Sequence, residues 1–262
     1  MKNVLVTGGT GNLGKQVVDY LQRKNYSVCV LSTKESTFRR KDFLFVRGDL
    51  STNTGLDKAT SQADIIIHCA SDPRNFEQVD LVGTRNLLQS INRAITQHII
   101  YISIVGVNKS TYPYYRAKFA AEELIANSGI PYTILRTTQF HNFILSILKS
   151  FINSQLNGVA SIPSGMRFQS VDIREVAGML VDNLEHPAGL LPDFGGPQIL
   201  TFEDMVQSYL NVTKTNVKIE VTDIAGEQFD LFRSGVNLSP NNSFGNITWQ
   251  SFLEQYTSSV TG

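Results

Sequence analysis

Cysteine and histidine are scarce in this 262-residue chain, which argues against a disulfide-rich or zinc-binding protein. The two cysteines, Cys29 and Cys69, both lie inside apolar runs. This position predicts buried free thiols and a reducing compartment. The cysteines and the four histidines show no spacing typical of a zinc site, so no metal is expected.

Long apolar runs and an excess of one charge are also lacking. No run approaches the roughly 20 residues that a membrane helix needs. Glycines interrupt the short apolar start, unlike in a secretory signal. We therefore expect a cytoplasmic protein that binds no membrane. Lys plus Arg and Asp plus Glu number 23 each, which gives no electrostatic basis for binding nucleic acid.

What the sequence does contain is an alternation of short apolar runs with helical patterns over the first 136 residues. Strands are predicted at residues 4–6, 28–31, 43–46, 65–67, 99–104 and 132–135. Helices are predicted at residues 13–21, 79–95 and 113–128. Such alternation implies right-handed crossovers. We predict an α/β fold with a Rossmann-type, doubly wound parallel sheet, which binds ligands beyond the carboxyl ends of its strands.

The pattern loosens after Arg136. Helices are predicted at residues 140–151, 172–184, 202–210 and 248–256, and a strand at 217–221. No linker rich in Gly, Ser or Pro sets this part off. We expect a single domain over residues 1–262, in which residues from about 137 onward form a small C-terminal α/β annex on the substrate side. A monomer or a homodimer is expected.

A glycine-rich turn joins the first strand to the first helix. It reads Thr7-Gly8-Gly9-Thr10-Gly11-Asn12-Leu13-Gly14. Gly8 permits a tight turn, Gly11 lets the backbone approach a pyrophosphate, and Gly14 lets the helix lie close to the sheet. The free N–H groups at the start of the helix attract phosphates. Residues 7–14 are therefore the predicted phosphate-binding part of a dinucleotide site.

The glycine spacing, G-x-x-G-x-x-G, resembles that of the short-chain dehydrogenase/reductase superfamily, and especially its atypical NmrA-like members. Asp49-Leu50 resembles the pair that lies beside the adenine, and Cys69-Ala70-Ser71 resembles the end of the fourth strand, which flanks the cofactor. Residues 79–88, 130–136 and 171–177 are also similar to that family. The resemblance covers about residues 1–210 and implies an NAD(P)-dependent oxidoreductase.

The end of the second strand favours NADP over NAD. An NAD site commonly has an acid there, but this strand ends in Ser32-Thr33-Lys34, and Glu35 lies slightly beyond. Hydroxyls and a lysine suit a 2′-phosphate, and Arg39 follows in the same loop. A solvated basic loop is the alternative interpretation.

Tyr114 and Lys118 form the Tyr-x-x-x-Lys of the family, on one side of a helix. The resemblance implies that Tyr114 gives a proton to the substrate oxygen. Lys118 would hold the nicotinamide ribose and favour the phenolate. Ser103 would donate a hydrogen bond to the substrate oxygen. Ser103 precedes Tyr114 by only 11 residues, fewer than the family usually has, and the neighbouring Tyr115 or Tyr112 could replace Tyr114.

Residues after the sixth strand are the predicted substrate contacts, because the family places this segment beside the nicotinamide. They are Gln139, Phe140, His141 and Phe143. His141 could equally be a packed histidine, and His68, inside the fourth strand, is expected to be a core histidine.

The leading hypothesis is an NADP-dependent reductase of a small carbonyl or quinone-like acceptor. One alternative is an NmrA-like redox sensor that binds the dinucleotide without turnover. The other is a sugar-nucleotide epimerase or dehydratase.

Overall fold

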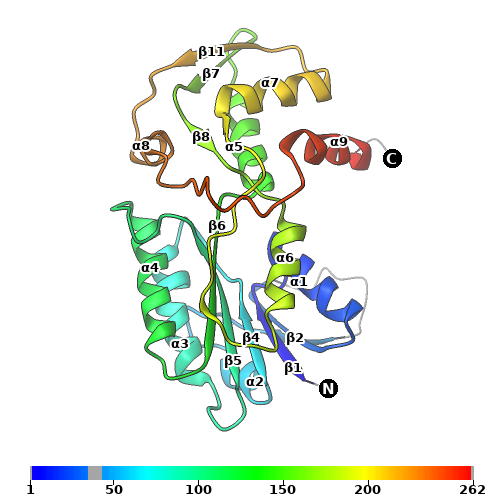
Figure 1. The fold of residues 1–262 in the computed structure, drawn as a ribbon, viewed down its shortest axis with the longest axis vertical. Coiled ribbons are helices and arrows are strands. Elements are labelled where there is room, and N and C mark those ends of the chain that lie inside the picture. The colour runs from blue at the N-terminus through cyan, green and yellow to red at the C-terminus, as the bar shows by residue number, and fades with distance from the viewer. Residues whose placement is uncertain (1, 35–42, 261–262) are drawn as a thin grey trace. The chain divides into compact units, whose positions relative to one another are not determined.

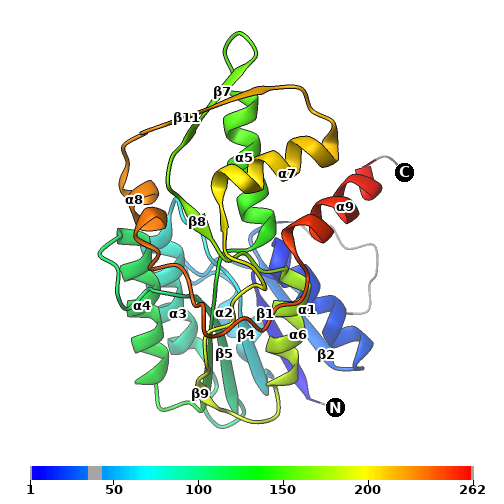
Figure 2. The same cartoon turned by 45° about the horizontal axis from the view of Figure 1, so that its top comes forward.

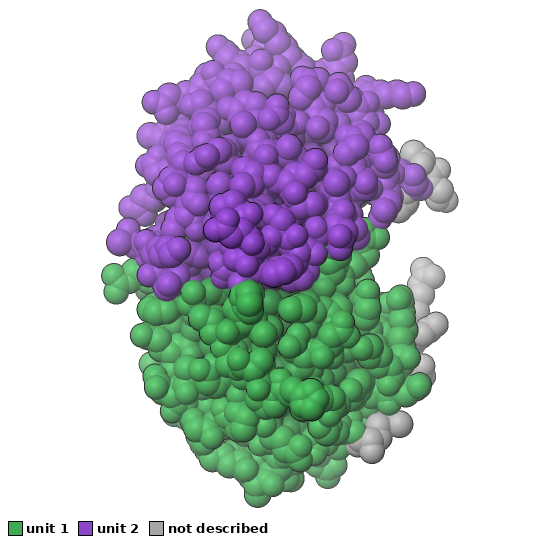
Figure 3. Space-filling model, viewed as in Figure 1, with its two compact units in different colours: residues 1–103, 113–136, 174–192 green, residues 104–112, 137–173, 193–262 purple. Residues whose placement is uncertain are grey.

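The computed structural model describes residues 2–34 and 43–260, and these divide into two compact units (Figure 3). The first unit comprises residues 1–103, 113–136 and 174–192. The second comprises residues 104–112, 137–173 and 193–262. Neither unit is one continuous stretch of sequence, because the chain leaves the first unit and later returns to it.

A seven-stranded sheet forms the centre of the first unit, in the order β3-β2-β1-β4-β5-β6-β9. Its strands are β1 (Asn3–Thr7), β2 (Ser27–Ser32), β3 (Leu44–Arg47), β4 (Ile65–His68), β5 (His98–Ile104), β6 (Tyr132–Thr137) and β9 (Gly189–Leu190). Neighbouring strands run parallel, with Val4 paired to Val28 on one side and to Ile65 on the other. The predicted Rossmann-type parallel sheet is confirmed.

Helices cover both faces of this sheet (Figures 1 and 2). They are α1 (Asn12–Arg23), α2 (Leu56–Thr60), the π-helix η1 (Glu77–Val82), α3 (Gly83–Ser90), α4 (Pro113–Ala126) and α6 (Ile173–Asp182). Apolar side chains of α2, α3 and α4 pack on one face in a cluster with Leu5, Ile66 and Tyr101. On the other face α6 lies beside α1, where Lys24 pairs with Asp182 at 2.6 Å.

The central strand β4 is buried along its whole length. Its consecutive residues Ile65, Ile66 and Ile67 are each at most 1% exposed. Side chains alternate between the two faces of a strand. A strand that is apolar at every position therefore needs cover on both faces, as the sequence indicated. On one face, Ile66 belongs to the same apolar cluster as Leu87 of α3.

The second unit combines helices with two small sheets. Its strands are β7 (Val159–Pro163), β8 (Arg167–Phe168), β10 (Leu200–Thr201) and β11 (Lys218–Thr222). Its helices are α5 (His141–Asn153), α7 (Phe202–Thr213), α8 (Glu227–Ser234) and α9 (Trp249–Val260). β7 pairs with β11 in parallel, and β8 with β10 antiparallel. Phe168 links parts of this unit by packing against Phe202 and Phe232.

The predicted helix over residues 79–95 is wrong in its extent and in its type. Its first part is the π-helix η1, which begins at Glu77, and the α-helix that follows ends at Ser90. Ile91 is extended, with ψ of 128°, and the Asn92 side chain accepts a hydrogen bond from the Ala94 N–H in the turn that follows. The short elements α2, α8, β7, β8, β9 and β10 were not predicted, because their short segments carry no clear periodic pattern.

Among residues 2–34 and 43–260, no helix is both long and apolar enough to span a membrane.

Candidate active site

The glycines of the turn between β1 and α1 have different steric roles. Gly8 has φ of +65°, and a Cβ there would lie 2.7 Å from the Ala70 Cα. A Cβ at Gly14 would lie 2.2 Å from the Gly8 carbonyl oxygen. A Cβ at Gly11 would meet only that same oxygen, at 3.1 Å. Gly8 and Gly14 are therefore needed for packing inside the unit, whereas Gly11 leaves the outer side of the turn open.

Helix α1 begins without a side-chain cap. Gly11 is its N-cap residue, and its carbonyl accepts the Lys15 N–H at 3.0 Å. The N–H groups of a first helical turn have no partner inside the helix. This part of residues 7–14, which includes Gly9, Asn12 and Leu13, therefore has the donors and the positive dipole that suit a pyrophosphate.

The end of β2 is tied to the glycine turn. The hydroxyls of Thr10 and Ser32 lie 2.6 Å apart, and the Lys34 N–H donates to the Ser32 hydroxyl at 3.2 Å. Ser32 is buried, whereas Thr33 and Lys34 are exposed. Arg39, the remaining predicted contact to a 2′-phosphate, lies outside the described residues.

A hydrogen-bonded histidine fixes β1 against β4. His68 Nδ1 lies 2.7 Å from the Thr7 hydroxyl, and His68 Nε2 lies 3.0 Å from the Thr84 hydroxyl. Burial, with the nearby charge of Lys118, lowers the pKa of His68 to about 3, so the ring stays neutral. His68 is thus the core histidine that the sequence indicated, and its hydrogen bonds hold the carboxyl end of β4 in place.

The residues after β3 and β4 shape the same end of the sheet. Asp49 Oδ1 accepts the Ser51 N–H at 2.8 Å, and Leu50 is buried with its carbonyl bonded to Asn86 Nδ2 at 2.7 Å. The Ala70 N–H donates to the Thr7 hydroxyl at 3.3 Å. Burial raises the pKa of the Cys69 thiol to about 12, so this thiol stays protonated.

The structure distinguishes the two adjacent tyrosines of α4. The hydroxyls of Tyr114 and Ser71 lie 2.8 Å apart, so the phenol of Tyr114 lies beside the segment that follows β4. Tyr115 is only 3% exposed and packs inside the molecule. Tyr114 is therefore the tyrosine whose hydroxyl lies beside the segment predicted to flank the cofactor.

Lys118 lies one turn after Tyr114 and is 2% exposed. Its ammonium donates to the Ile102 carbonyl at 2.8 Å, lies 3.6 Å from Asp80 Oδ1, and sits 4.2 Å from the centre of the Tyr101 ring. Burial lowers the pKa of Lys118, and the negative charge of Asp80 opposes that change. The sequence analysis missed Asp80. An acidic residue among the apolar Val79, Leu81 and Val82 was a signal that a buried charge lies there.

Ser103 is 1% exposed and lies near the carboxyl end of β5. Its hydroxyl has no hydrogen-bond partner among the described residues. Tyr101 lies two residues earlier, so both side chains are on the same face of the strand. Ser103 thus lies on the face of β5 that packs against α4.

The predicted substrate contacts belong to the second unit. His141 is 1% exposed, with Nδ1 2.8 Å from the Ser170 hydroxyl and Nε2 3.0 Å from the Ile247 carbonyl. Its ring packs on Trp249 and Phe252. This is the packed histidine that the sequence analysis kept as an alternative.

The other members of that set differ in exposure. Phe143 is 42% exposed and Phe140 half-buried, whereas Gln139 is buried and accepts a hydrogen bond from Asn237 Nδ2 at 3.1 Å. The side chains available to a ligand in this segment are therefore the two phenylalanines.

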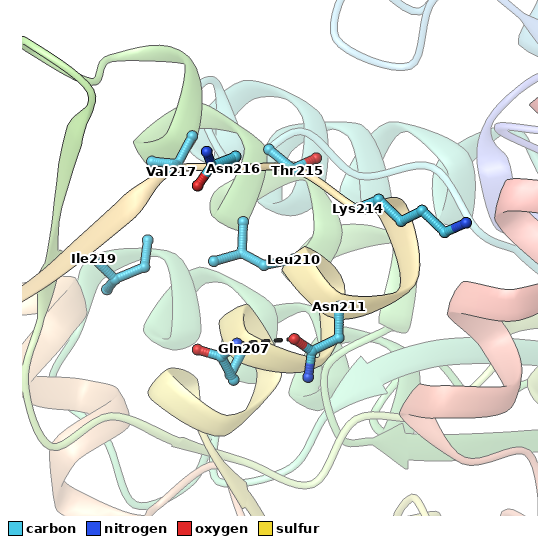
Figure 4. Close-up of a pocket in the computed structure, with 8 residues that line it drawn as sticks. All are labelled: Gln207, Leu210, Asn211, Lys214, Thr215, Asn216, Val217 and Ile219. Atoms are coloured by element: carbon cyan, nitrogen blue, oxygen red, sulfur yellow. Dashed lines mark hydrogen bonds between the residues drawn. The ribbon is translucent and has the colours of Figure 1, made fainter.

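A separate open hollow of about 510 Å³ lies in the second unit between the end of α7 and β11 (Figure 4). Its rim is polar, with Gln207 Nε2 donating to Asn211 Oδ1 at 3.0 Å, while Leu210, Val217 and Ile219 are apolar. It contains none of the residues that the sequence analysis selected.

Comparison with known proteins identifies the family. The model of the NAD(P)H-binding family matches residues 8–187. A photosystem II assembly factor, Ycf39 of Cyanophora paradoxa, is 32% identical over 146 residues, which are 53% of this chain and 46% of that protein. The human sterol-4-alpha-carboxylate 3-dehydrogenase, decarboxylating, is 30% identical over 112 residues, 40% of this chain and 30% of that protein. The chain thus matches less than half the length of each.

Among solved structures, the UDP-glucose 4-epimerase of Thermus thermophilus, in complex with NAD, has a similar fold. It is 20% identical, the match covers 99% of both chains, and the TM-score is 0.80. At this identity the likeness shows the fold alone. The family match and the parallel sheet together show that this chain belongs to the NAD(P)H-binding family, of the atypical short-chain dehydrogenase/reductase, NmrA-like type.

Proposed function

We propose that this protein is an NADP-dependent oxidoreductase that reduces a small carbonyl or quinone-like acceptor. The observation that carries the proposal is the placement of Tyr114. Its hydroxyl lies 2.8 Å from that of Ser71, directly after β4, and Lys118 follows one turn later on the same helix. The phenol that would act as the proton donor thus lies in the same unit as the glycine turn.

The residues around the glycine turn fit a dinucleotide. Gly11 leaves room beside the uncapped start of α1, which would hold the pyrophosphate. Asp49, Leu50 and the segment from Cys69 to Ser71 would flank the adenine and the rest of the cofactor. When bound, the cofactor supplies the hydride. Ser32, Thr33, Lys34 and Arg39 would prefer NADP, because charge-assisted donors suit a 2′-phosphate.

Within this chain, Tyr114 would give its phenolic proton to the acceptor oxygen as the hydride arrives. Lys118 would hold the nicotinamide ribose and favour the phenolate that remains. Ser103 would donate a hydrogen bond to the same oxygen. In the second unit, Phe140 and Phe143 are the side chains of this segment that would be available to a substrate. The burial of Gln139 and the hydrogen bonds of His141 favour packing roles for those two residues.

NADPH oxidation with a panel of quinones and aldehydes tests the proposal. Tyr114→Phe removes the proton donor and should lower kcat by about 10²–10⁴-fold. The dissociation constant of NADPH should stay unchanged, because the ring and the cofactor contacts remain. Tyr115→Phe is the matched control and should keep the wild-type kcat. Titrations with NADH and NADPH test the preference, and NADPH should bind more tightly.

A non-catalytic dinucleotide-binding role is the second candidate. The spacing of Ser103 favours it, since Ser103 precedes Tyr114 by only 11 residues, fewer than the family usually has. The likeness to an assembly factor also supports it. NADPH binding with no turnover of any acceptor would establish this candidate in place of the reductase.

A further inference from the structure

The interior beside α4 contains a charged group that the proposed chemistry does not use. Asp80 is 1% exposed, and Oδ1 of its carboxylate accepts no hydrogen bond within the described part of the chain. Its other oxygen, Oδ2, accepts the Asp72 N–H at 3.1 Å. A buried carboxylate oxygen without a donor is costly unless a cation compensates its charge.

The compensating cation is Lys118. Its ammonium lies 3.6 Å from Asp80 Oδ1, and both side chains are at most 3% exposed. The Ile102 carbonyl and the face of the Tyr101 ring contact the same ammonium. Three negative or electron-rich groups therefore surround one buried cation, and Asp80 is the one of these three that carries a full charge.

The local backbone places Asp80 at this position. It lies in the π-helix η1, and the Thr84 hydroxyl donates to the Asp80 carbonyl oxygen at 2.5 Å. Single π-helical turns are rare and frequently occur at functional sites. Thr84 also contacts His68, so the turn that carries Asp80 is anchored to β4.

We infer that Asp80 is a positioning residue, which keeps Lys118 protonated and fixed so that its ammonium can hold the cofactor ribose beside Tyr114. This inference rests on the proposed role of Lys118. Without the carboxylate, the charge of the buried lysine would be uncompensated. Losing the proton is the change that costs such a group the least free energy.

Other groups near Lys118 do not replace Asp80. The titratable or charged groups that face it are Asp80 on η1, Glu122 on α4, Tyr101 on β5, and His68 and Cys69 at the end of β4. Glu122 is already paired with Arg136 through two hydrogen bonds. Tyr101, His68 and Cys69 are neutral, because burial raises the pKa of Tyr101 and Cys69 and lowers that of His68.

Asp80→Asn tests the inference, because it removes the charge and keeps the shape. Glu77→Gln is the matched control, since Glu77 is on the same π-helix but exposed. At pH 7 we expect Asp80→Asn to lower the folding equilibrium constant about a hundredfold, and the control to leave it nearly unchanged. The double variant, Asp80→Asn with Lys118→Met, also removes the lysine charge and should recover most of the lost folding equilibrium constant.

The pH dependence separates this role from simple packing. The pKa of Lys118 in the folded protein is below its unfolded value, so the charged lysine costs stability at low pH and this cost disappears as pH rises. Asp80→Asn lowers that pKa further. The ratio of folding equilibrium constants, wild type over Asp80→Asn, should therefore be largest near pH 6 and should fall toward pH 10. When both proteins also carry Lys118→Met, this ratio should not fall in that way.

Cofactor affinity gives a second measurement that needs no turnover. As pH rises, the variant should lose the lysine proton before wild type does. The ratio of NADPH dissociation constants, Asp80→Asn over wild type, should grow about tenfold between pH 6 and pH 9. Parallel pH profiles for Asp80→Asn and Glu77→Gln would overturn the inference. Absence of turnover would instead contradict the proposed reductase and leave these binding and stability results intact.

Discussion

At the scale of single residues, two glycines of the phosphate turn should affect different properties. Substitution of Gly11 should mainly weaken NADPH binding, whereas substitution of Gly14 should mainly destabilise the fold. Gly11→Ala adds a Cβ whose one close contact is the Gly8 carbonyl oxygen at 3.1 Å, at an extended backbone position that alanine adopts freely. It should cost about 0.5 kcal/mol of stability. It should also raise the NADPH dissociation constant at least about tenfold, because the methyl group occupies the space of the pyrophosphate.

Gly14→Ala is the opposite case, because its Cβ would lie 2.2 Å from the Gly8 carbonyl oxygen. We expect a loss of about 2 kcal/mol in the free energy of unfolding, as overpacked sites show. Urea unfolding and NADPH titration of both variants measure the two effects. A Gly11→Ala variant with wild-type NADPH affinity would contradict the assignment of the phosphate turn.

The sequence predicted the positions of such residues better than their surroundings. The order of turn, strand and helix located Gly8, Gly11 and Gly14, because each has a local backbone role. Tyr114 and Tyr115 could not be ranked, since burial depends on how α4 lies against the sheet. Asp80 was missed for the same reason, because its partner Lys118 is 38 positions away in the chain.

At the scale of elements, an ion pair joins α4 to β6. Arg136 Nε and Nη2 donate to the two carboxylate oxygens of Glu122 at 2.9 and 2.6 Å, and both residues are buried. Glu122→Ala should destabilise the protein by about 3 kcal/mol, because it leaves the guanidinium without its carboxylate in the interior. The neighbouring Glu123 is exposed, and Glu123→Ala should change stability by less than about 0.5 kcal/mol.

Thermal or urea unfolding of these two variants checks the difference. Equal stabilities would mean that the buried pair contributes no more than a surface carboxylate. The element scale is also where sequence prediction worked best. Pro113 and Gly129 mark the ends of the helix that became α4, and a run of three isoleucines marks β4. The π-helix η1 could not be foreseen, since its distinction from an α-helix lies in its backbone hydrogen-bond pattern and not in its composition.

At the scale of the whole molecule, the chain leaves the first unit after Arg136 and returns to it at residue 174. The returning segment matters to the sheet. β9 pairs with β6 through Thr133 and Gly189, and His98 Nδ1 lies 2.9 Å from the Leu184 carbonyl. Local sequence patterns do not reveal such a return, because they say nothing of which distant segment completes a sheet.

Truncation tests how much the first unit depends on this segment. A chain that ends at residue 173 lacks the buried apolar side chains of residues 174–192, namely Val176, Ala177, Leu180, Val181 and Leu184. Each large one contributes roughly 1.5–3 kcal/mol, and the sum approaches the ~5–15 kcal/mol that stabilises a whole domain. We therefore expect residues 1–173 to show no cooperative urea transition and no NADPH binding. A chain ending at residue 192 restores the missing helix and strand and should recover a cooperative transition. If residues 1–173 unfolded as cooperatively as residues 1–192, the first unit would not need the segment that returns to it.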